Sequence, residues 1–277
     1  MSHPIYPCLW FDGQAQEAAK YYCSFFKNAN ISTDNGMVVI WELEGFRFMG
    51  LNGDPQFKPN PSVSFFITCE SKEEVDQYWK HLSDGGQVMM PLDTYSWSEY
   101  YGFVKDKFGI AWQIYKGDQS MQKIIPCLLF TDEHFGQADN AIKWYQKIFK
   151  DHEVDHVYYY PEDELGRKNL VEHAQFTLNK SVMMAMDGKG EHHFEFNEAI
   201  SFVISCDTQE EIDHYWNGLT EGGEESMCGW LKDAFGVSWQ VVPSKLGTWM
   251  NDPEKGPRVI EAFMKMRKFD IQTLLNV

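Results

Sequence analysis

The chain has 277 residues, more than one hydrophobic core usually serves, so two domains are expected. Apolar residues make up 43% of the chain and aromatic residues 16%. This content is enough to form packed hydrophobic cores and excludes a disordered chain. The formal charge of −17 repels phosphate backbones and anionic lipid, so neither nucleic acid nor a membrane is an expected partner.

The N-terminal part predicts a strand, a helix and a hairpin. Residues 5–11 form a short apolar run that ends at a turn-forming Asp-Gly pair. In residues 15–26, alanines and aromatic residues recur at the three- and four-residue spacing of one helix face. Two further apolar runs, 38–43 and 46–51, are separated by a Glu-Gly pair and predict a hairpin.

A second set of elements follows. Residues 62–68 predict a strand. Ser71 stands three residues before Glu74, a capping box that begins a helix, and a pair of glycines ends this helix. Two strands, near 100–105 and 110–115, close the unit.

The same order of elements then occurs again. Residues 62–86 match 199–223, and YGFVKDKFGIAWQIYK (101–116) matches CGWLKDAFGVSWQVVP (228–243). With only two helices per copy, most strand pairs must be antiparallel. We therefore predict an α+β fold of four tandem βαβββ units, two per domain, in curved mixed or antiparallel sheets with the helices on the convex face.

The repeat also predicts the domain organisation. The expected domains are residues 1–118 and 122–244, joined by a linker near 117–123 and related by an approximate two-fold axis as an intramolecular pseudo-dimer. A homodimer of whole chains is a further possibility. An apolar stripe with basic residues around it predicts a C-terminal helical tail in 245–277, packed on the second domain or between the two.

The repeated segment, 101–116 and 228–243, contains residues that shape the fold and one polar residue suited to a binding site. Asp106 and Gly109 predict a tight turn between two strands. Trp112 and Gln113 then alternate along the closing strand, so their side chains face opposite ways. The indole suits the helix-covered core, and the amide of Gln113 suits a pocket on the concave face.

We expect a small-molecule ligand in such a pocket in each copy. The predicted pocket residues are Gln113, Ser64, Trp97, Tyr100 and Tyr101 in the first copy, and Gln240, Ser201, Cys228 and Trp230 in the second. The aromatic residues have an alternative role in packing. Cys228 has an alternative role as a nucleophile if Lys232 lowers the pKa of its thiol.

Other polar clusters have simpler interpretations. The run His192–Glu195 is expected in a surface loop, with a metal ligand set as the alternative. Glu172 and His173 are a candidate acid–base pair at the start of a strand. Four of the six cysteines lie in apolar, strand-like runs and the N-terminus does not resemble a secretory signal, so we expect reduced cysteines and a cytoplasmic protein.

Two motifs, D-x-F-G-x-x-W-Q and F-D-G-Q-A-x-E-A (Phe11–Ala18), resemble the vicinal oxygen chelate superfamily, which includes glyoxalase I, extradiol dioxygenases and bleomycin-resistance proteins. Residues 228–243 and the tail GPRVIEAFMKMRKFDIQTL are similar to its PhnB-like branch, whose members often carry the label 3-demethylubiquinone-9 3-methyltransferase. The resemblance covers both copies and the tail.

The resemblance implies positions for a metal. The superfamily's ligand positions fall near Pro7, Met49, Ser64 and Gln113 in the first copy and near Pro126, Met184, Ser201 and Gln240 in the second. None of these is a carboxylate or an imidazole, so we expect neither a metal nor another cofactor. Methyl transfer would need a Gly-rich turn in an alternating parallel α/β chain, whereas the glycine pairs here end helices.

The sequence therefore favours a cytoplasmic protein that binds a small organic molecule in concave sheet pockets without a catalytic metal. The alternative is a lyase, isomerase or dioxygenase acting on a small oxygenated substrate. The fold alone does not distinguish these functions, because one scaffold can host all of them.

Overall fold

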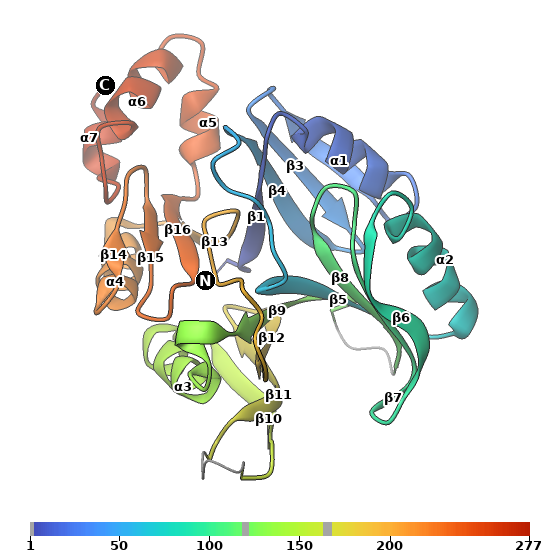
Figure 1. Ribbon diagram of the computed structural model, residues 1–277. Helices are drawn as coiled ribbons and strands as arrows, with labels where there is room; N and C mark the ends of the chain where they lie inside the picture. Colours follow the sequence, from blue (N-terminus) through green and yellow to red (C-terminus); the bar gives the residue numbers. More distant parts are fainter. Residues whose placement is uncertain (1–2, 118–121, 163–167) are drawn as a thin grey trace.

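A computed structural model of the protein contains two eight-stranded sheets with helices on their outer faces (Figure 1). It describes residues 3–117, 122–162 and 168–277, so most of the predicted linker lies outside the described residues. In spatial order, the first sheet consists of β14 (Glu224–Glu225), β15 (Trp230–Lys232), β16 (Ser238–Pro243), β13 (Ile200–Cys206), β1 (Tyr6–Phe11), β4 (Phe46–Asn52), β3 (Val38–Leu43) and β2 (Asn30–Asp34). The second consists of β10 (His152–Tyr159), β11 (Val171–Leu178), β12 (Ser181–Asp187), β9 (Ile124–Phe130), β5 (Val63–Cys69), β8 (Ala111–Lys116), β7 (Ser98–Lys105) and β6 (Gln87–Tyr95).

The helices complete four βαβββ units. They are α1 (Ala15–Cys23), α2 (Lys72–Leu82), α3 (Ala138–Ile148) and α4 (Gln209–Thr220), followed by the tail helices α5 (Leu246–Met250), α6 (Gly256–Phe263) and α7 (Ile271–Leu275). Each unit has one parallel strand pair, namely β1–β4, β5–β8, β9–β12 or β13–β16, and its other pairs are antiparallel. The predicted α+β class and its four repeat units are confirmed.

Both sheets run across the two repeats. In the first sheet β1 pairs antiparallel with β13, with Cys8 opposite Ser201, and in the second β5 pairs antiparallel with β9, with Ser64 opposite Cys127. Each sheet therefore takes two units from different halves of the chain. The division into domains 1–118 and 122–244 remains a prediction about the chain.

The helix-covered cores, in contrast, join the two units within one half of the chain. The Tyr22 hydroxyl of α1 donates to Asp106 at 2.6 Å, and the Tyr145 hydroxyl of α3 donates to Asp233 at 2.7 Å. The largest fully buried aromatic side chains include Trp41, Phe48, Phe65 and Trp112 in the first half and Phe130, Phe149, Phe176, Phe202 and Trp239 in the second. Burial of these large side chains stabilises the fold by removing apolar surface from water.

The doubled turn forms as predicted. The Asp106 carboxylate accepts hydrogen bonds from the backbone N–H groups of Phe108 and Ile110, at 2.9 and 3.0 Å, and Gly109 has a φ of +86°. Trp112 is fully buried in the core, while Gln113 lies on the opposite face of the strand. The turn is therefore scaffold, and it fixes the strand that carries Gln113.

The capping pair predicted at Ser71 is confirmed, and the matching pair of the second repeat also forms. Ser71 Oγ accepts from the Glu74 N–H at 3.2 Å at the start of α2, and Thr208 Oγ1 accepts from the Glu211 N–H at 3.3 Å at the start of α4. These bonds satisfy N–H groups that the first helical turn leaves without partners.

The tail differs from the single helix expected from its apolar stripe. The stripe is interrupted after Phe263, because the carbonyls of Met266 and Arg267 accept hydrogen bonds from the Cys228 and Gly229 N–H groups, both at 2.7 Å. The chain there forms turns and bends and lies against the second repeat, beside β14–β16 (Figure 1). Within the described ranges, no helix has the length and apolar character needed to span a bilayer.

Candidate functional site

A polar network lies on the concave face of the second sheet. Gln113 Nε2 donates to Ser64 Oγ at 2.9 Å, and the Tyr101 hydroxyl donates to Gln113 Oε1 at 2.5 Å. All three side chains are buried, and burial raises the pKa of the Tyr101 hydroxyl. The hydroxyl therefore stays protonated at neutral pH and acts as a donor. Three of the predicted pocket residues are thus brought together by hydrogen bonds.

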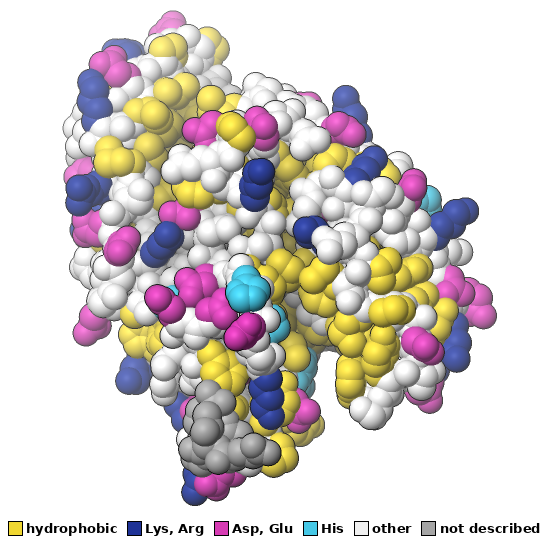
Figure 2. Space-filling view, in the orientation of Figure 1, with side chains coloured by type: hydrophobic (Ala, Val, Ile, Leu, Met, Phe, Trp, Pro, Cys, Tyr) yellow, Lys and Arg dark blue, Asp and Glu magenta, His cyan; other side chains and the backbone are white. Residues whose placement is uncertain are grey.

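The surroundings of this network are apolar and rich in sulfur. The hydrophobic cluster around the network has as its buried members Phe66, Tyr101, Ile125, Cys127 and Met184. The partly buried residues packed against this cluster are Met90, Tyr95, Phe103, Tyr115, Val182 and Met186. Figure 2 shows hydrophobic side chains gathered over the β6–β7 part of the sheet, beside a hollow that separates them from β10–β12. Such a surface suits an apolar ligand that carries one polar group.

Trp97 and Tyr100 occupy different positions. Trp97 stacks on Tyr95 with ring centroids 5.0 Å apart, lies 6.4 Å from Tyr101, and is 65% exposed, so it extends the concave face outward. Tyr100 faces α2, where its hydroxyl donates to Asp76 at 2.6 Å. Neighbouring residues of a strand point to opposite faces, so Tyr100 does not join the pocket residues.

A histidine pair stands at the β10–β11 side of the same face. His156 Nε2 and His173 Nδ1 are 3.0 Å apart, and the His173 ring lies 6.3 Å from Phe66. Burial and the charge of His156 lower the pKa of His173 to about 4, so its imidazole is neutral at pH 7. The acid–base pair with Glu172 does not form, because Glu172 is exposed and His173 is bonded to His156.

The first sheet carries a matching network. Gln240 Nε2 donates to Ser201 Oγ at 3.0 Å, and Cys8 lies opposite Ser201 on the neighbouring strand β1. Burial raises the pKa of Cys8 to about 12, and the polar groups of Gln240 and Ser201 lower it by less. Cys8 is therefore a neutral thiol at physiological pH and not a thiolate.

Cys228 and Trp230 lie in a pocket at the β14–β15 end of this sheet. The pocket has a volume of about 350 Å³ and includes Trp10 of β1. The Cys228 thiol contacts the Phe263 carbonyl and Met264 Sδ, both at 3.8 Å, and burial raises its pKa. Lys232 pairs with Glu198 at 2.8 Å. The lysine therefore does not lower the pKa of the Cys228 thiol, as the alternative role of Cys228 as a nucleophile requires.

The positions at which the resemblance implies a metal carry only neutral donor groups. The concave residues are Cys8, Met49, Ser201 and Gln240 in the first sheet and Cys127, Met184, Ser64 and Gln113 in the second. Pro7 and Pro126 were the wrong residues, since strand alternation puts Cys8 and Cys127 on this face. Neutral thiols, thioethers, hydroxyls and amides do not fit a hard divalent ion.

The side chains of the His192–Glu195 run, the other candidate for metal binding, do not point to a common centre. His193 lies 3.8 Å from Glu191, and Glu195 accepts a hydrogen bond from the Glu133 N–H, so the His192–Glu195 run does not converge. This run has no helix or strand, as expected of a loop. In the described part of the chain, no three His, Cys, Asp or Glu side chains are grouped so that they could hold a metal ion.

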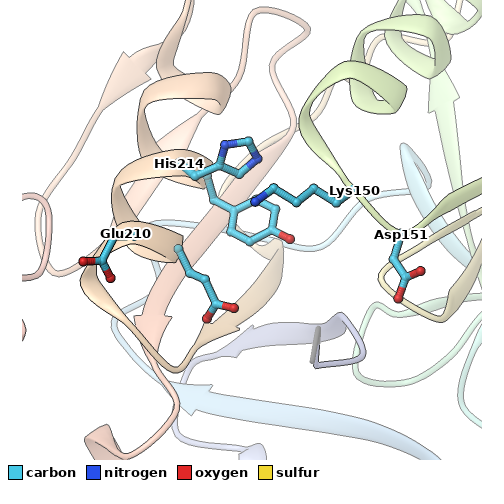
Figure 3. Close-up of a pocket in the computed structure, with 6 residues that line it drawn as sticks. Lys150, Asp151, Glu210 and His214 are labelled. Atoms are coloured by element: carbon cyan, nitrogen blue, oxygen red, sulfur yellow. The ribbon is translucent and has the colours of Figure 1, made fainter.

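A second depression lies on the helix-covered side of the protein. It has a volume of about 310 Å³ and is lined by Lys150, Asp151, Glu210, Glu211, His214 and Tyr215. Figure 3 shows Lys150 extending toward His214, with Glu210 and Asp151 at opposite ends. His214 Nε2 is hydrogen-bonded to the Ile148 carbonyl at 2.7 Å, which ties α4 to α3 and gives the imidazole a structural role.

Sequence reasoning missed three groups of the concave faces. The sequence predicts Cys8 and Cys127 only as buried hydrophobic residues. Because side chains alternate between the two faces of a strand, the same pattern could have placed both thiols on the concave face with the amides of Gln113 and Gln240. Trp10 could have been found by the same alternation. The contact of His156 with His173 depends on the pairing of β10 with β11, for which the sequence has no strong signal.

The chain is similar to one described family and to several solved structures. A family model described as 3-demethylubiquinone-9 3-methyltransferase matches residues 3–115 and 122–242. A PhnB protein from Bacillus cereus, provisionally described by the same activity, is 30% identical over 40% of this chain and 98% of its own, with a TM-score of 0.39. Glyoxalase I from Zea mays is 11% identical over 88% of this chain and 93% of its own, with a TM-score of 0.61, which shows a shared fold.

No curated protein matches the chain. The family model nevertheless covers both repeats and most of the sequence. The chain therefore shares its fold with glyoxalase I and belongs to the family described as 3-demethylubiquinone-9 3-methyltransferase.

Proposed function

We propose that this protein binds a small organic molecule on the concave faces of its sheets, without a catalytic metal. The observation that carries the proposal is the buried network of Gln113, Ser64 and Tyr101 in an otherwise apolar, aromatic surface. The proposal places the protein in the cytoplasm, where its six free cysteines would stay reduced.

The chemistry of the amide defines what the ligand needs. Gln113 has two N–H donors and an oxygen with two lone pairs, and Ser64 and Tyr101 use one of each. The remaining capacity suits a carbonyl or hydroxyl group. Because the surrounding side chains are uncharged, the ligand in this sheet should be neutral, with an apolar or aromatic body that contacts Phe66 and Met184.

The enzymatic alternatives have less support. A lyase, isomerase or dioxygenase of this superfamily would use a hard divalent metal ion, and the neutral donor sets beside Gln113 and Gln240 do not fit such an ion. Methyl transfer, which the family description names, usually relies on a Gly-rich turn at a parallel α/β sheet. The two mixed sheets here do not provide that arrangement.

A ligand screen with matched variants tests the proposal. Neutral aromatic carbonyl and phenol compounds would be screened by thermal shift, and hits measured by calorimetry. Gln113→Ala should weaken binding roughly tenfold while the protein stays folded, because it removes a buried hydrogen-bonding group. Gln175→Ala is the control, since Gln175 belongs to the same sheet but bonds Asp155. Equal binding by the Gln113 variant, or loss of binding in EDTA, would contradict the proposal.

A further inference from the structure

The pocket at the β14–β15 end of the first sheet differs from the Gln113 site in having charged residues in its lining. It holds about 350 Å³, a volume within the range of small-molecule sites. Its lining residues with aromatic rings are Trp10, Phe57 and Trp230, and those with charged side chains are Glu198, Glu224, Glu225 and Lys232. The pocket therefore combines aromatic walls with carboxylates.

The aromatic walls are fixed relative to one another. The Trp10 ring lies 5.3 Å from Phe57 at 84° and 6.2 Å from Trp230 at 79°, so both neighbours are nearly perpendicular to it. The Trp10 Nε1–H donates to the Asp54 carbonyl at 2.7 Å, which holds the indole in place. Perpendicular rings cannot cover each other's π faces completely, and a π face attracts a cation.

The charges of the lining favour the same kind of ligand. Lys232 pairs with Glu198 at 2.8 Å and balances that carboxylate. Glu225 accepts from the Trp216 indole at 3.1 Å and lies 3.7 Å from Arg267, an ion pair exposed enough for solvent to weaken it. Glu224 adds a further exposed carboxylate, so the lining is negative, as is the whole protein at −17.

We infer that this pocket binds an organic cation, such as a quaternary or methylated ammonium group, on the rings of Trp10 and Trp230 with the carboxylates at its rim. The inference rests on the proposed binding function and names the ligand class of this one site. A neutral ligand would lack the charge–charge attraction to the carboxylates, and an anion would be repelled by them.

The second sheet lacks the residues that would hold a cation at the corresponding place. By the repeat, Trp10, Glu198 and Trp230 correspond to Leu129, Pro61 and Phe103. One carboxylate and two indoles are thus replaced by apolar residues. The cation site is therefore specific to the first sheet, and the two sheets should select different ligands.

Choline and its uncharged carbon isostere, 3,3-dimethyl-1-butanol, test the inference on the intact protein. We expect choline to bind saturably in calorimetry and to change tryptophan fluorescence, and the isostere to bind roughly tenfold more weakly because it lacks the cation–π attraction. Raising the salt concentration should weaken choline binding. Equal affinity for the two compounds would overturn the cation class, and no saturable binding of choline would overturn the site itself.

Variants locate the binding. Trp230→Leu keeps an apolar side chain but removes a ring, and should weaken choline binding roughly tenfold. Glu224→Gln, at an exposed position where folding is not at risk, should weaken it roughly threefold. Phe103→Leu, at the matching position of the second sheet, is the control for choline and should leave choline binding unchanged. Choline binding that is unaffected by both pocket variants would overturn the inference, whereas a neutral ligand lost only in Gln113→Ala would leave the proposed function intact.

Discussion

Asp106 and Asp233 each accept four hydrogen bonds inside the protein. Asp106 binds two backbone N–H groups of its turn, the Tyr22 hydroxyl and the Trp112 indole, the last at 2.8 Å. Asp233 has the equivalent partners in the second repeat, including the Trp239 indole at 2.8 Å. One carboxylate thus holds a turn, a helix and a core indole together, far from the concave face.

Asp106→Ala should therefore destabilise the protein without acting on the ligand. The change leaves buried donors without an acceptor, and we expect the free energy of unfolding to fall by about 4 kcal/mol. Denaturant unfolding followed by circular dichroism measures this. A variant with unchanged stability and abolished ligand binding would show instead that Asp106 is a functional residue.

The ionisation of Asp233 predicts a pH dependence of stability. Burial raises its pKa to about 6 in the folded protein, against 3.8 for an ordinary aspartate. Because the folded state holds the proton more tightly, this contribution to stability is complete below about pH 4 and is lost as pH rises through 6, by about 3 kcal/mol.

The variant Asp233→Asn isolates this contribution, because its amide does not titrate. The stability of the native protein relative to this variant should fall between pH 4 and 7. A difference that is constant over this range, or that grows with pH, would contradict the assignment.

At the scale of elements, sequence patterns predicted the helices and core strands well. Their signals are local, as in the Ser71 cap and the turn at Asp106. The strands β2 and β6 were not predicted, because their side chains are mostly polar or exposed and lack apolar alternation. The tail helix was predicted too long, because Met266 and Arg267 bond to Cys228 and Gly229, a contact between distant segments.

The docking of the tail can be tested at Gly229. This glycine has a φ of +81°, and a Cβ there would lie 2.5 Å from the Phe269 ring and 2.6 Å from the Val241 carbonyl. Gly229→Ala should cost about 3 kcal/mol of unfolding free energy. Gly247→Ala is the control, since a Cβ there meets nothing within 4 Å, and in helix α5 it should stabilise by about 0.5 kcal/mol. Equal effects of the two changes on the melting temperature would contradict the tail contact.

At the scale of the whole molecule, each concave face is shared between the two halves of the chain. The sequence predicted that Gln113 faces Ser64 and Gln240 faces Ser201, because each pair lies within one repeat. It did not predict that Cys8 joins the second of these pairs. That contact requires β1 to pair with β13, and pairing between distant strands leaves no local pattern.

Sharing of the sheets predicts a single unfolding transition. Neither half can unfold without removing strands from both sheets, so the two should melt together. Tryptophan fluorescence and far-ultraviolet circular dichroism should give coincident denaturant curves. Two separate transitions would show that the halves are energetically independent.

Native mass spectrometry of the purified protein, before and after treatment with a chelator, distinguishes binding of an organic ligand without a metal from metal-dependent catalysis. We predict a bound organic molecule whose mass and occupancy are unchanged by the chelator, together with loss of this adduct in Gln113→Ala. A first-row metal present at one or more atoms per chain, removed by the chelator together with the organic adduct, would contradict the account and favour a metal-dependent enzyme.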